Sequence, residues 1–181
     1  MSRVLLLSLV AGLLAACTPA AAPEAPPAAP ASETAALAPW IEKVSPDPVA
    51  GTVARLTRAI EAGGAMVVAV VDHRANATKA GLDLPETTVV IFGNAAVGTP
   101  LMQADRRVAL DLPLKVLVWR DGGVTRVGYL PPRALAARYG IAADHPSVAA
   151  MTGALDRLTD AAIAPSASPD PATSAIRQTD P

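Results

Sequence analysis

"LKVLVWRDGGVTRVGYL", residues 114–130, decides the fold class, because two β-branched and aromatic runs flank a glycine turn. Either Asp121-Gly122 or Gly122-Gly123 suits the two-residue turn of a β-hairpin, and both choices place the same residues on each face. One face is predicted to carry Leu114, Val116, Val118, Val127 and Tyr129, and the other Lys115, Leu117, Trp119, Val124 and Arg126. The hairpin therefore predicts antiparallel strands with one apolar face for a core.

The residues before this hairpin contain further short apolar runs. Strands are predicted around residues 40–44, over 65–73 (AMVVAVVDH) and over 87–94 (TTVVIFGN). A helix is predicted over 49–64, with Asp47 as its cap, Pro48 at its first position and two glycines at its end. Its apolar residues recur at helical spacing: Val49, Val53, Leu56 and Ile60.

The other predicted helices complete the order of elements. Residues 75–81 and 131–140 predict short helical segments, and a longer helix begins at Pro146. The longer helix carries an apolar stripe: Val148, Met151, Leu155 and Leu158. The order strand, helix, four strands, helix predicts an α+β fold, a single antiparallel sheet of about five strands with helices packed on one face.

The N-terminal stretch MSRVLLLSLVAGLLAAC predicts a signal peptide over residues 1–16. Its apolar run is shorter than the roughly 20 residues that a transmembrane helix needs. Cys17 is the only cysteine, and its position resembles a bacterial lipobox. This resemblance implies acylation of Cys17 by a diacylglyceryl group and an N-acyl chain. It also implies an anchor facing the periplasm, in the outer membrane because Thr18 rather than aspartate follows. The alternative is an ordinary signal cleaved near Ala16.

The rest of the chain divides by composition. Residues 17–37 are predicted to be the lipidated cysteine and a disordered Ala/Pro-rich tether, 38–164 one globular domain, and 165–181 a disordered tail. The chain has 15 basic and 16 acidic residues and no basic run, so nucleic acid is not an expected partner. With Cys17 acylated, the domain has no thiol for a disulfide or a thiolate metal site, and no cofactor is expected.

The stretch VVIFGNAAVGTPLM, residues 89–102, has glycines at the spacing of a phosphate-binding loop. Such a loop needs a lysine after its second glycine and then a serine or threonine. Thr99 and Pro100 follow Gly98 instead, and the dinucleotide fingerprint is also absent. We therefore expect no nucleotide, and expect Thr99-Pro100 to start a helix.

Several strings resemble the bacterial family catalogued as domain of unknown function 302. They are IFGN (91–94), GTPLMQAD (98–105) and LDLPLKVLVW (110–119), preceded by DHRANATKAGLDLPETT (72–88). The resemblance covers about residues 49–139. It implies a fold similar to the TATA-binding-protein-like arrangement and no known activity. Ala95 stands where the family usually has proline, and many members carry cysteines at the positions of Gly93 and Leu114. Thiol or metal chemistry built on those cysteines is therefore not open to this chain.

A ligand site is predicted where one strand ends and its antiparallel neighbour begins. Asn94 and Lys115 should lie near each other there, with a helix N-terminus at Thr99 close by, and the three could hold a small anionic ligand. The alternative is that Asn94 makes a local turn hydrogen bond and Lys115 is a solvated charge at the sheet edge.

His73 and Asn76 are secondary candidates for ligand binding. A histidine can transfer protons near neutral pH, but a structural histidine bonded to its loop is the alternative. His145, before Pro146, is interpreted as marking a helix start, and two histidines give no transition-metal site. No catalytic set is recognisable.

The predicted function is therefore an uncharacterised envelope lipoprotein with a non-catalytic domain that binds a small, anionic ligand or a protein. The alternatives are a periplasmic enzyme using His73 or Lys115, and a purely structural envelope protein. The hairpin face with Trp119 opposes the one assigned to the helices, and uncovered apolar faces meet partners. We expect a weak homodimer with Trp119 near its centre.

Overall fold

A computed structural model describes residues 40–165. The predicted signal peptide, Cys17, the tether up to residue 37 and the tail beyond Pro165 lie outside the described residues. The described part contains one sheet of five strands in the order β1-β5-β4-β3-β2. The strands are β1 (Ile41–Ser45), β2 (Met66–Asp72), β3 (Thr87–Gly93), β4 (Leu114–Asp121) and β5 (Val124–Tyr129).

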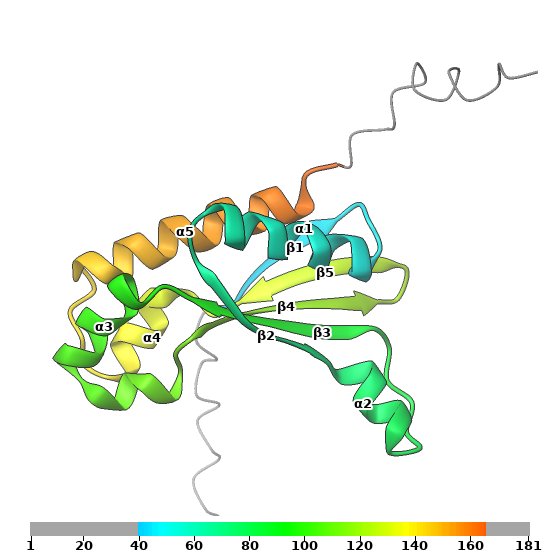
Figure 1. Cartoon of the computed structure of the whole chain (residues 1–181), viewed down its shortest axis with the longest axis horizontal. Coiled ribbons are helices and arrows are strands. Elements are labelled where there is room, and N and C mark those ends of the chain that lie inside the picture. Colours follow the sequence, from blue (N-terminus) through cyan, green and yellow to red (C-terminus); the bar gives the residue numbers. More distant parts are fainter. Residues whose placement is uncertain (1–39, 166–181) are drawn as a thin grey trace, which may run out of the picture. The chain divides into compact units, whose positions relative to one another are not determined.

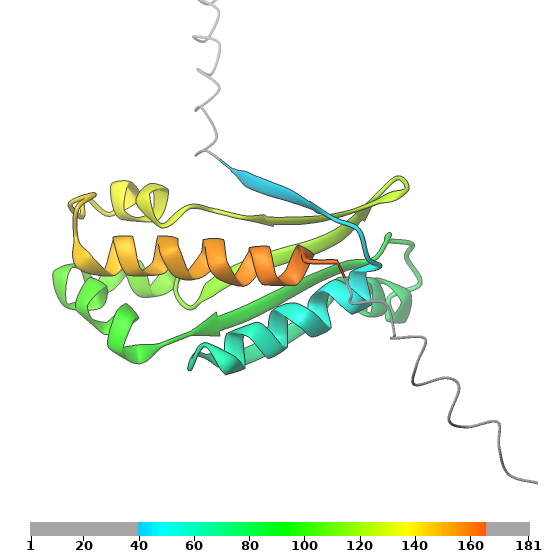
Figure 2. The same cartoon turned by 90° about the horizontal axis from the view of Figure 1, so that it is seen from above.

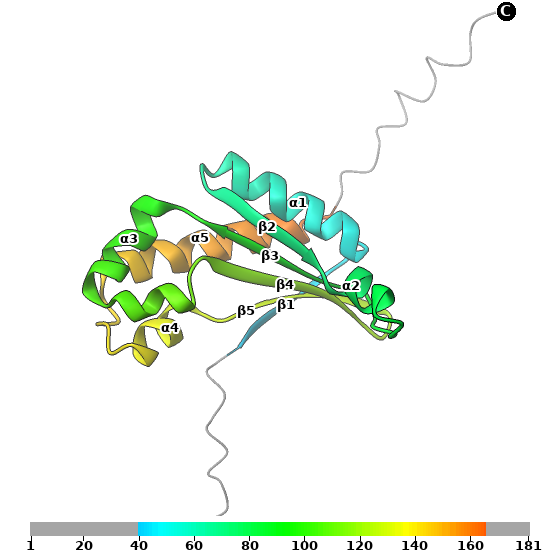
Figure 3. The same ribbon diagram turned by 60° about the horizontal axis from the view of Figure 1, so that its bottom comes forward.

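Every pair of neighbouring strands in this sheet is antiparallel. Two long helices, α1 (Val49–Ala62) and α5 (Pro146–Ile163), lie side by side on one face of the sheet (Figures 1 and 2). Figure 3 shows the opposite face, with both long helices behind the strands. The predicted α+β class, with strand, helix, four strands and helix in that order, is confirmed.

The shorter helices lie at the two ends of the sheet (Figure 1). At one end, α2 (His73–Lys79) follows β2. At the other, α3 (Ala95–Ala104) and the 3-10 helix η1 (Arg106–Leu110) connect β3 to β4, and α4 (Pro132–Arg138) follows β5. The end of the sheet where β3 stops and β4 starts is therefore surrounded by helices.

The β4–β5 hairpin has the predicted faces. Asp121 pairs with Val124, so Gly122 and Gly123 form the turn. Gly122 has φ +55, a conformation that favours glycine. Val118 pairs with Val127, and both are fully buried beneath the helices. The alternation of the two strands thus supplies the centre of the core.

The core consists of two clusters of buried side chains. The larger lies between the sheet and α1 with the C-terminal half of α5: Val49, Leu56, Ile60, Val90, Phe92, Val116, Val118, Val127, Tyr129, Leu155 and Ala162. The smaller lies among α3, η1, α4 and the start of α5: Leu101, Val108, Leu112, Ala136, Val148 and Met151. Leu114 packs against both clusters.

The start of α1 differs from its prediction. Pro48 is the N-cap residue and makes no side-chain cap hydrogen bond. Asp47 instead forms an ion pair with Arg55, with 2.6 Å between Oδ2 and Nη2. The prediction that Asp47 caps the helix is therefore wrong, because its carboxylate reaches a cation two turns along the helix.

Candidate functional site

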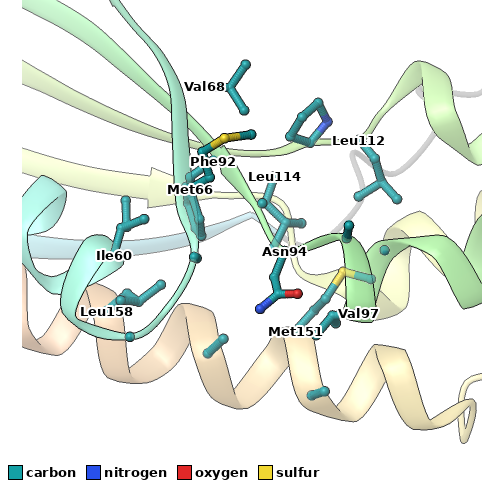
Figure 4. A pocket seen from close by; sticks show the side chains of 18 of the residues that line it. Ile60, Met66, Val68, Phe92, Asn94, Val97, Leu112, Leu114, Met151 and Leu158 are labelled. Atoms are coloured by element: carbon teal, nitrogen blue, oxygen red, sulfur yellow. The ribbon is translucent and has the colours of Figure 1, made fainter.

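A cavity of about 560 Å³ lies where the ends of α1 and β3, the start of β2, α3 and the N-terminal half of α5 meet. In Figure 4, Ile60 and Leu158 lie on one side of it, Val97 and Met151 on the other, and Asn94 between them. Most of its lining residues are apolar. Pockets that bind small molecules have about this volume and this character.

The cavity separates the two core clusters. Ile60 and Phe92 belong to the larger cluster and Leu112 and Met151 to the smaller one, and all four line the cavity. The cavity is open to solvent at its rim, where Met66 and Val68 are exposed. An apolar occupant would therefore contact side chains of both clusters.

Small residues of α5 leave this space open. Ala149, Ala150, Gly153 and Ala154 all line the cavity. Their spacing places them on one side of the helix, next to the buried stripe of Val148, Met151 and Leu155. Larger side chains at these positions would close the gap between α5 and α3. These four residues were not among the predicted site residues, although their grouping on one helical face is visible in the sequence.

Asn94 lies at the edge of the cavity and holds two segments together. Its Oδ1 accepts a hydrogen bond from the Ala96 N–H at 2.9 Å, and its Nδ2 donates to the Gly64 carbonyl oxygen at 3.3 Å. The first bond makes Asn94 the N-cap of α3. The second ties the α1–β2 turn to the start of α3. The local bond that was the alternative interpretation of Asn94 is therefore present.

The helix after β3 starts earlier than predicted. α3 begins at Ala95, and Pro100 lies inside it. The prediction that Thr99-Pro100 starts the helix is wrong, because the Asn94 side chain caps the helix nearer to the end of β3. Thr99 also lines the cavity, so the structure brings Asn94 and Thr99 to the same site.

Lys115 does not join Asn94 and Thr99. It lines a second cavity of about 260 Å³ on the outer side of the sheet, near α4. Lys115 pairs with Ile91 of β3, so the two side chains lie on the same face of the sheet. Asn94 follows Ile91 by an odd number of residues, so alternation directs its side chain to the opposite face. The Lys115 Nζ donates to the carbonyl oxygens of Asp111 at 2.9 Å and Pro113 at 3.2 Å.

The second cavity also contains a charged network around Asp111. Its Oδ2 accepts hydrogen bonds from Arg138 Nη1 at 2.9 Å and from the Tyr139 hydroxyl at 2.8 Å. Partial burial acts to raise the pKa of Asp111, but the hydrogen bonds from Tyr139 and Arg138 outweigh it and lower the pKa. The network joins the loop before β4 to the end of α4.

His73 and Asn76 are both exposed on α2, at the end of the sheet away from α3 (Figure 1). The structure therefore does not bring them to Asn94. Asp72 caps α2, its Oδ1 accepting from the Ala75 N–H at 2.9 Å. His145 caps α5, its Nδ1 accepting from the Ser147 N–H at 3.2 Å, which confirms its interpretation as a helix start.

Trp119 lies on the outer sheet face, as predicted, but this face is partly covered. Trp40 packs against it, with 6.1 Å between ring centroids and an angle of 56° between the rings. Trp40 itself is 44% exposed. The aromatic surface available to a partner is therefore shared between the two rings.

Metal-binding clusters and membrane-spanning helices are both absent from residues 40–165. These residues contain no group of three or more histidine, cysteine, aspartate or glutamate side chains arranged to hold a metal ion. Within the same range, no helix combines the length and apolar character needed to cross a membrane.

The geometry defines a class of protein: a single α+β domain with two helices on one face of a five-stranded antiparallel sheet and an apolar cavity at one end. The model of the family described as "Domain of unknown function DUF302" matches residues 41–162, and the chain belongs to this family. A crystal structure of an uncharacterized conserved DUF302 protein from Bacillus stearothermophilus has the same fold. It has a TM-score of 0.63 at 18% identity and covers 68% of this chain and 97% of its own.

Two curated relatives have a named activity. "Fluoride-specific ion channel FluC 1" of Brucella suis is 42% identical over 108 residues, which are 58% of this chain and 42% of the relative. "Fluoride-specific ion channel FluC 2" of Brucella melitensis is 42% identical over 108 residues, 58% of this chain and 40% of the relative. The chain thus spans about two fifths of the length of the curated relatives it matches.

Proposed function

We propose that this protein is a non-catalytic binding domain of the bacterial cell envelope, which holds a small, largely apolar ligand between α1, α3 and α5. The observation that carries this proposal is the apolar cavity of about 560 Å³ that opens between the two core clusters. Atoms lining an empty cavity lack partners on one side and lose dispersion energy. Apolar surface that an occupant covers is also removed from water. An apolar occupant therefore gains both contacts and release from water.

The position of polar groups supports binding with a fixed orientation. Asn94, Thr99 and Arg157 line the cavity, and all three are exposed residues. The polar groups therefore lie at the mouth, and the apolar side chains form the interior. Ligand pockets commonly combine an apolar interior with a few polar groups that orient the ligand.

A location at a membrane is part of the same proposal. The lipobox-like sequence ending at Cys17 supports a lipid anchor in the outer membrane, facing the periplasm. The named relatives are ion channels, and the match to this chain covers only 40–42% of their length. We infer that the shared region is an accessory domain beside a membrane, attached to a channel in those relatives and to a lipid here.

Fluoride itself is a poor fit to this cavity. A small, strongly hydrated anion loses its hydration in an apolar interior without a compensating set of hydrogen-bond donors. The name of the relatives therefore supports a location at a membrane, and it does not support fluoride as the ligand of this cavity. Sodium fluoride belongs in the binding assays as a direct check of this argument.

The enzyme alternative rests on His73 or Lys115. These residues lie apart, His73 after the end of β2 and Lys115 at the start of β4, and neither lines the large cavity. A metabolite screen that finds turnover abolished by His73→Ala or Lys115→Met would establish catalysis and contradict the binding proposal.

Filling the cavity tests the proposal directly. The chain is prepared from residue 18, which keeps all of the described residues 40–165. A neutral apolar dye that brightens in apolar surroundings should bind to the unmodified domain. Ala154→Leu adds three carbon atoms to the cavity wall and should abolish binding, while stability rises by about 0.5 to 2 kcal/mol.

Ala161→Leu is the matched control, because Ala161 is on the same helix but exposed and outside the cavity. It should leave dye binding unchanged. Dye binding that persists in Ala154→Leu, or no binding to the unmodified domain, would contradict the proposal.

The lipid anchor has its own test. Mass spectrometry of the mature N-terminus should find Cys17 as the first residue, carrying acyl chains, in protein that sediments with membranes. An unmodified Cys17, or a mature chain beginning at another residue, would rule out the anchor without affecting the binding proposal.

A further inference from the structure

Among the described residues that line the large cavity, Arg157 is the only charged one. It follows Gly153 by one helical turn on α5, and a Cβ placed on Gly153 would lie 3.2 Å from Arg157 Nη1. The guanidinium group therefore extends back over Gly153, another residue of the cavity lining. The absence of a side chain at Gly153 leaves this path open to the guanidinium.

The carboxylates nearest to Arg157 on α5 are engaged elsewhere. Asp156 Oδ1 accepts a hydrogen bond from the Tyr129 hydroxyl at 2.7 Å. Asp160 Oδ1 forms an ion pair with Lys43 Nζ at 2.6 Å. Between residues 40 and 165, Arg157 has no hydrogen bond or ion pair of its own. The cavity therefore has one cation at its mouth and no anion of its own.

The rim of the cavity continues the apolar interior outward. Met66 is 68% exposed and Val68 is 50% exposed, and both line the cavity from the edge strand β2. Methionine adapts to ligands of irregular shape. A ligand longer than the cavity would cover this apolar rim, whereas a compact one would leave it in water.

We propose that the cavity binds a single-chain amphiphile, with its acyl chain among the apolar side chains and its anionic head group on Arg157. This inference rests on the proposed binding function and deepens it. The charge complementarity comes from one unpaired guanidinium beside an interior without charges. A guanidinium binds carboxylate and phosphate groups in a bidentate manner, so either a fatty acid or the phosphate of a lysolipid has the required chemistry.

The test compares ligands that share a chain and differ in their head groups. Dodecanoate and dodecyl phosphate, each below its micelle concentration, and dodecanol, below its solubility limit, compete with the apolar dye for the chain prepared from residue 18. We expect dodecanoate or dodecyl phosphate to bind on the order of 10-fold more tightly than dodecanol, as expected for a charge-assisted bond at an exposed site. The stronger of the two anions identifies the head group.

Variants separate this inference from the proposed function. Arg157→Gln should remove the preference for the anions and leave dodecanol binding intact, and Arg157→Lys should keep part of the preference. Arg133→Gln, an exposed arginine on α4, is the control and should change nothing. Equal binding of the anions and dodecanol, or a preference that survives Arg157→Gln, would overturn the head-group assignment. Failure of all three ligands and the dye to bind would instead overturn the proposed function.

Discussion

Trp40 occupies the space that a side chain at residue 128 would need. A Cβ built on Gly128 would lie 2.1 Å from Trp40 Cζ2 and 3.0 Å from Trp119 Cζ3. Gly128 lies in β5 opposite Leu117 and Glu42, on the outer face of the sheet. The glycine therefore lets Trp40 lie against the sheet beside Trp119.

This relationship predicts the effect of Gly128→Ala. The added methyl group must displace Trp40, which should lower the free energy of unfolding by about 1 to 3 kcal/mol and shift tryptophan fluorescence to longer wavelength. Chemical unfolding and emission spectra measure both effects. Gly123→Ala is the control, because nothing lies within 4 Å of its added Cβ. An unchanged emission spectrum in Gly128→Ala would contradict the packing of Trp40.

The Trp119 face gives a prediction about self-association. Trp119 and the exposed part of Trp40 leave an aromatic surface on the outer face of the sheet, and such surfaces favour partners. Sedimentation of the chain at micromolar concentration should show a weak homodimer, and Trp119→Ala should shift it to monomer. A strictly monomeric unmodified chain would remove this prediction and leave the face to a different partner.

Tyr129 predicts the behaviour at alkaline pH. Burial and the hydrogen bond to Asp156 raise the pKa of Tyr129 to about 12. Because the pKa is raised, the stabilisation is complete below the unfolded value of about 10 and is lost as the pH rises further. Absorbance titration of tyrosinate should show Tyr129 ionising near pH 12. Tyr129→Phe should abolish that step, whereas a titration in which Tyr129 ionises with a midpoint near the ordinary value of about 10 would contradict it.

Asp111 predicts the behaviour at acid pH. Its pKa is lowered, so its stabilisation is present above the unfolded value of about 3.9 and is lost as the pH falls through the lower folded value. Asp111→Asn should lower stability by about 1 kcal/mol at neutral pH, and by less in strong acid. Urea unfolding at both pH values measures this, with exposed Asp83→Asn as the control. An equal loss at both pH values would show that the charge of Asp111 is not responsible.

The order of the elements and the faces of the hairpin were determined by the sequence alone. Val118 and Val127 were predicted to share a buried face, and both are fully buried. These features depend on periodicity within one strand or helix and on turn residues such as Gly122, so they are local. The exact start of each helix was harder to predict, because more than one nearby residue could mark it. Asn94 caps α3, so the helix begins before Pro100, and Asp47 pairs with Arg55 instead of capping α1.

Only the tertiary structure decided where the candidate site lies. Asn94 directly follows β3 and Lys115 lies in the adjacent strand β4, but the alternation of side chains divides them between two cavities. The large cavity depends on how far α5 stands from α1 and α3, which small residues such as Gly153 and Ala154 permit but do not require. Arg157 is an ordinary helical arginine in the sequence. It lines an apolar cavity, and the neighbouring carboxylates do not pair with it because Tyr129 and Lys43, distant in the chain, engage them.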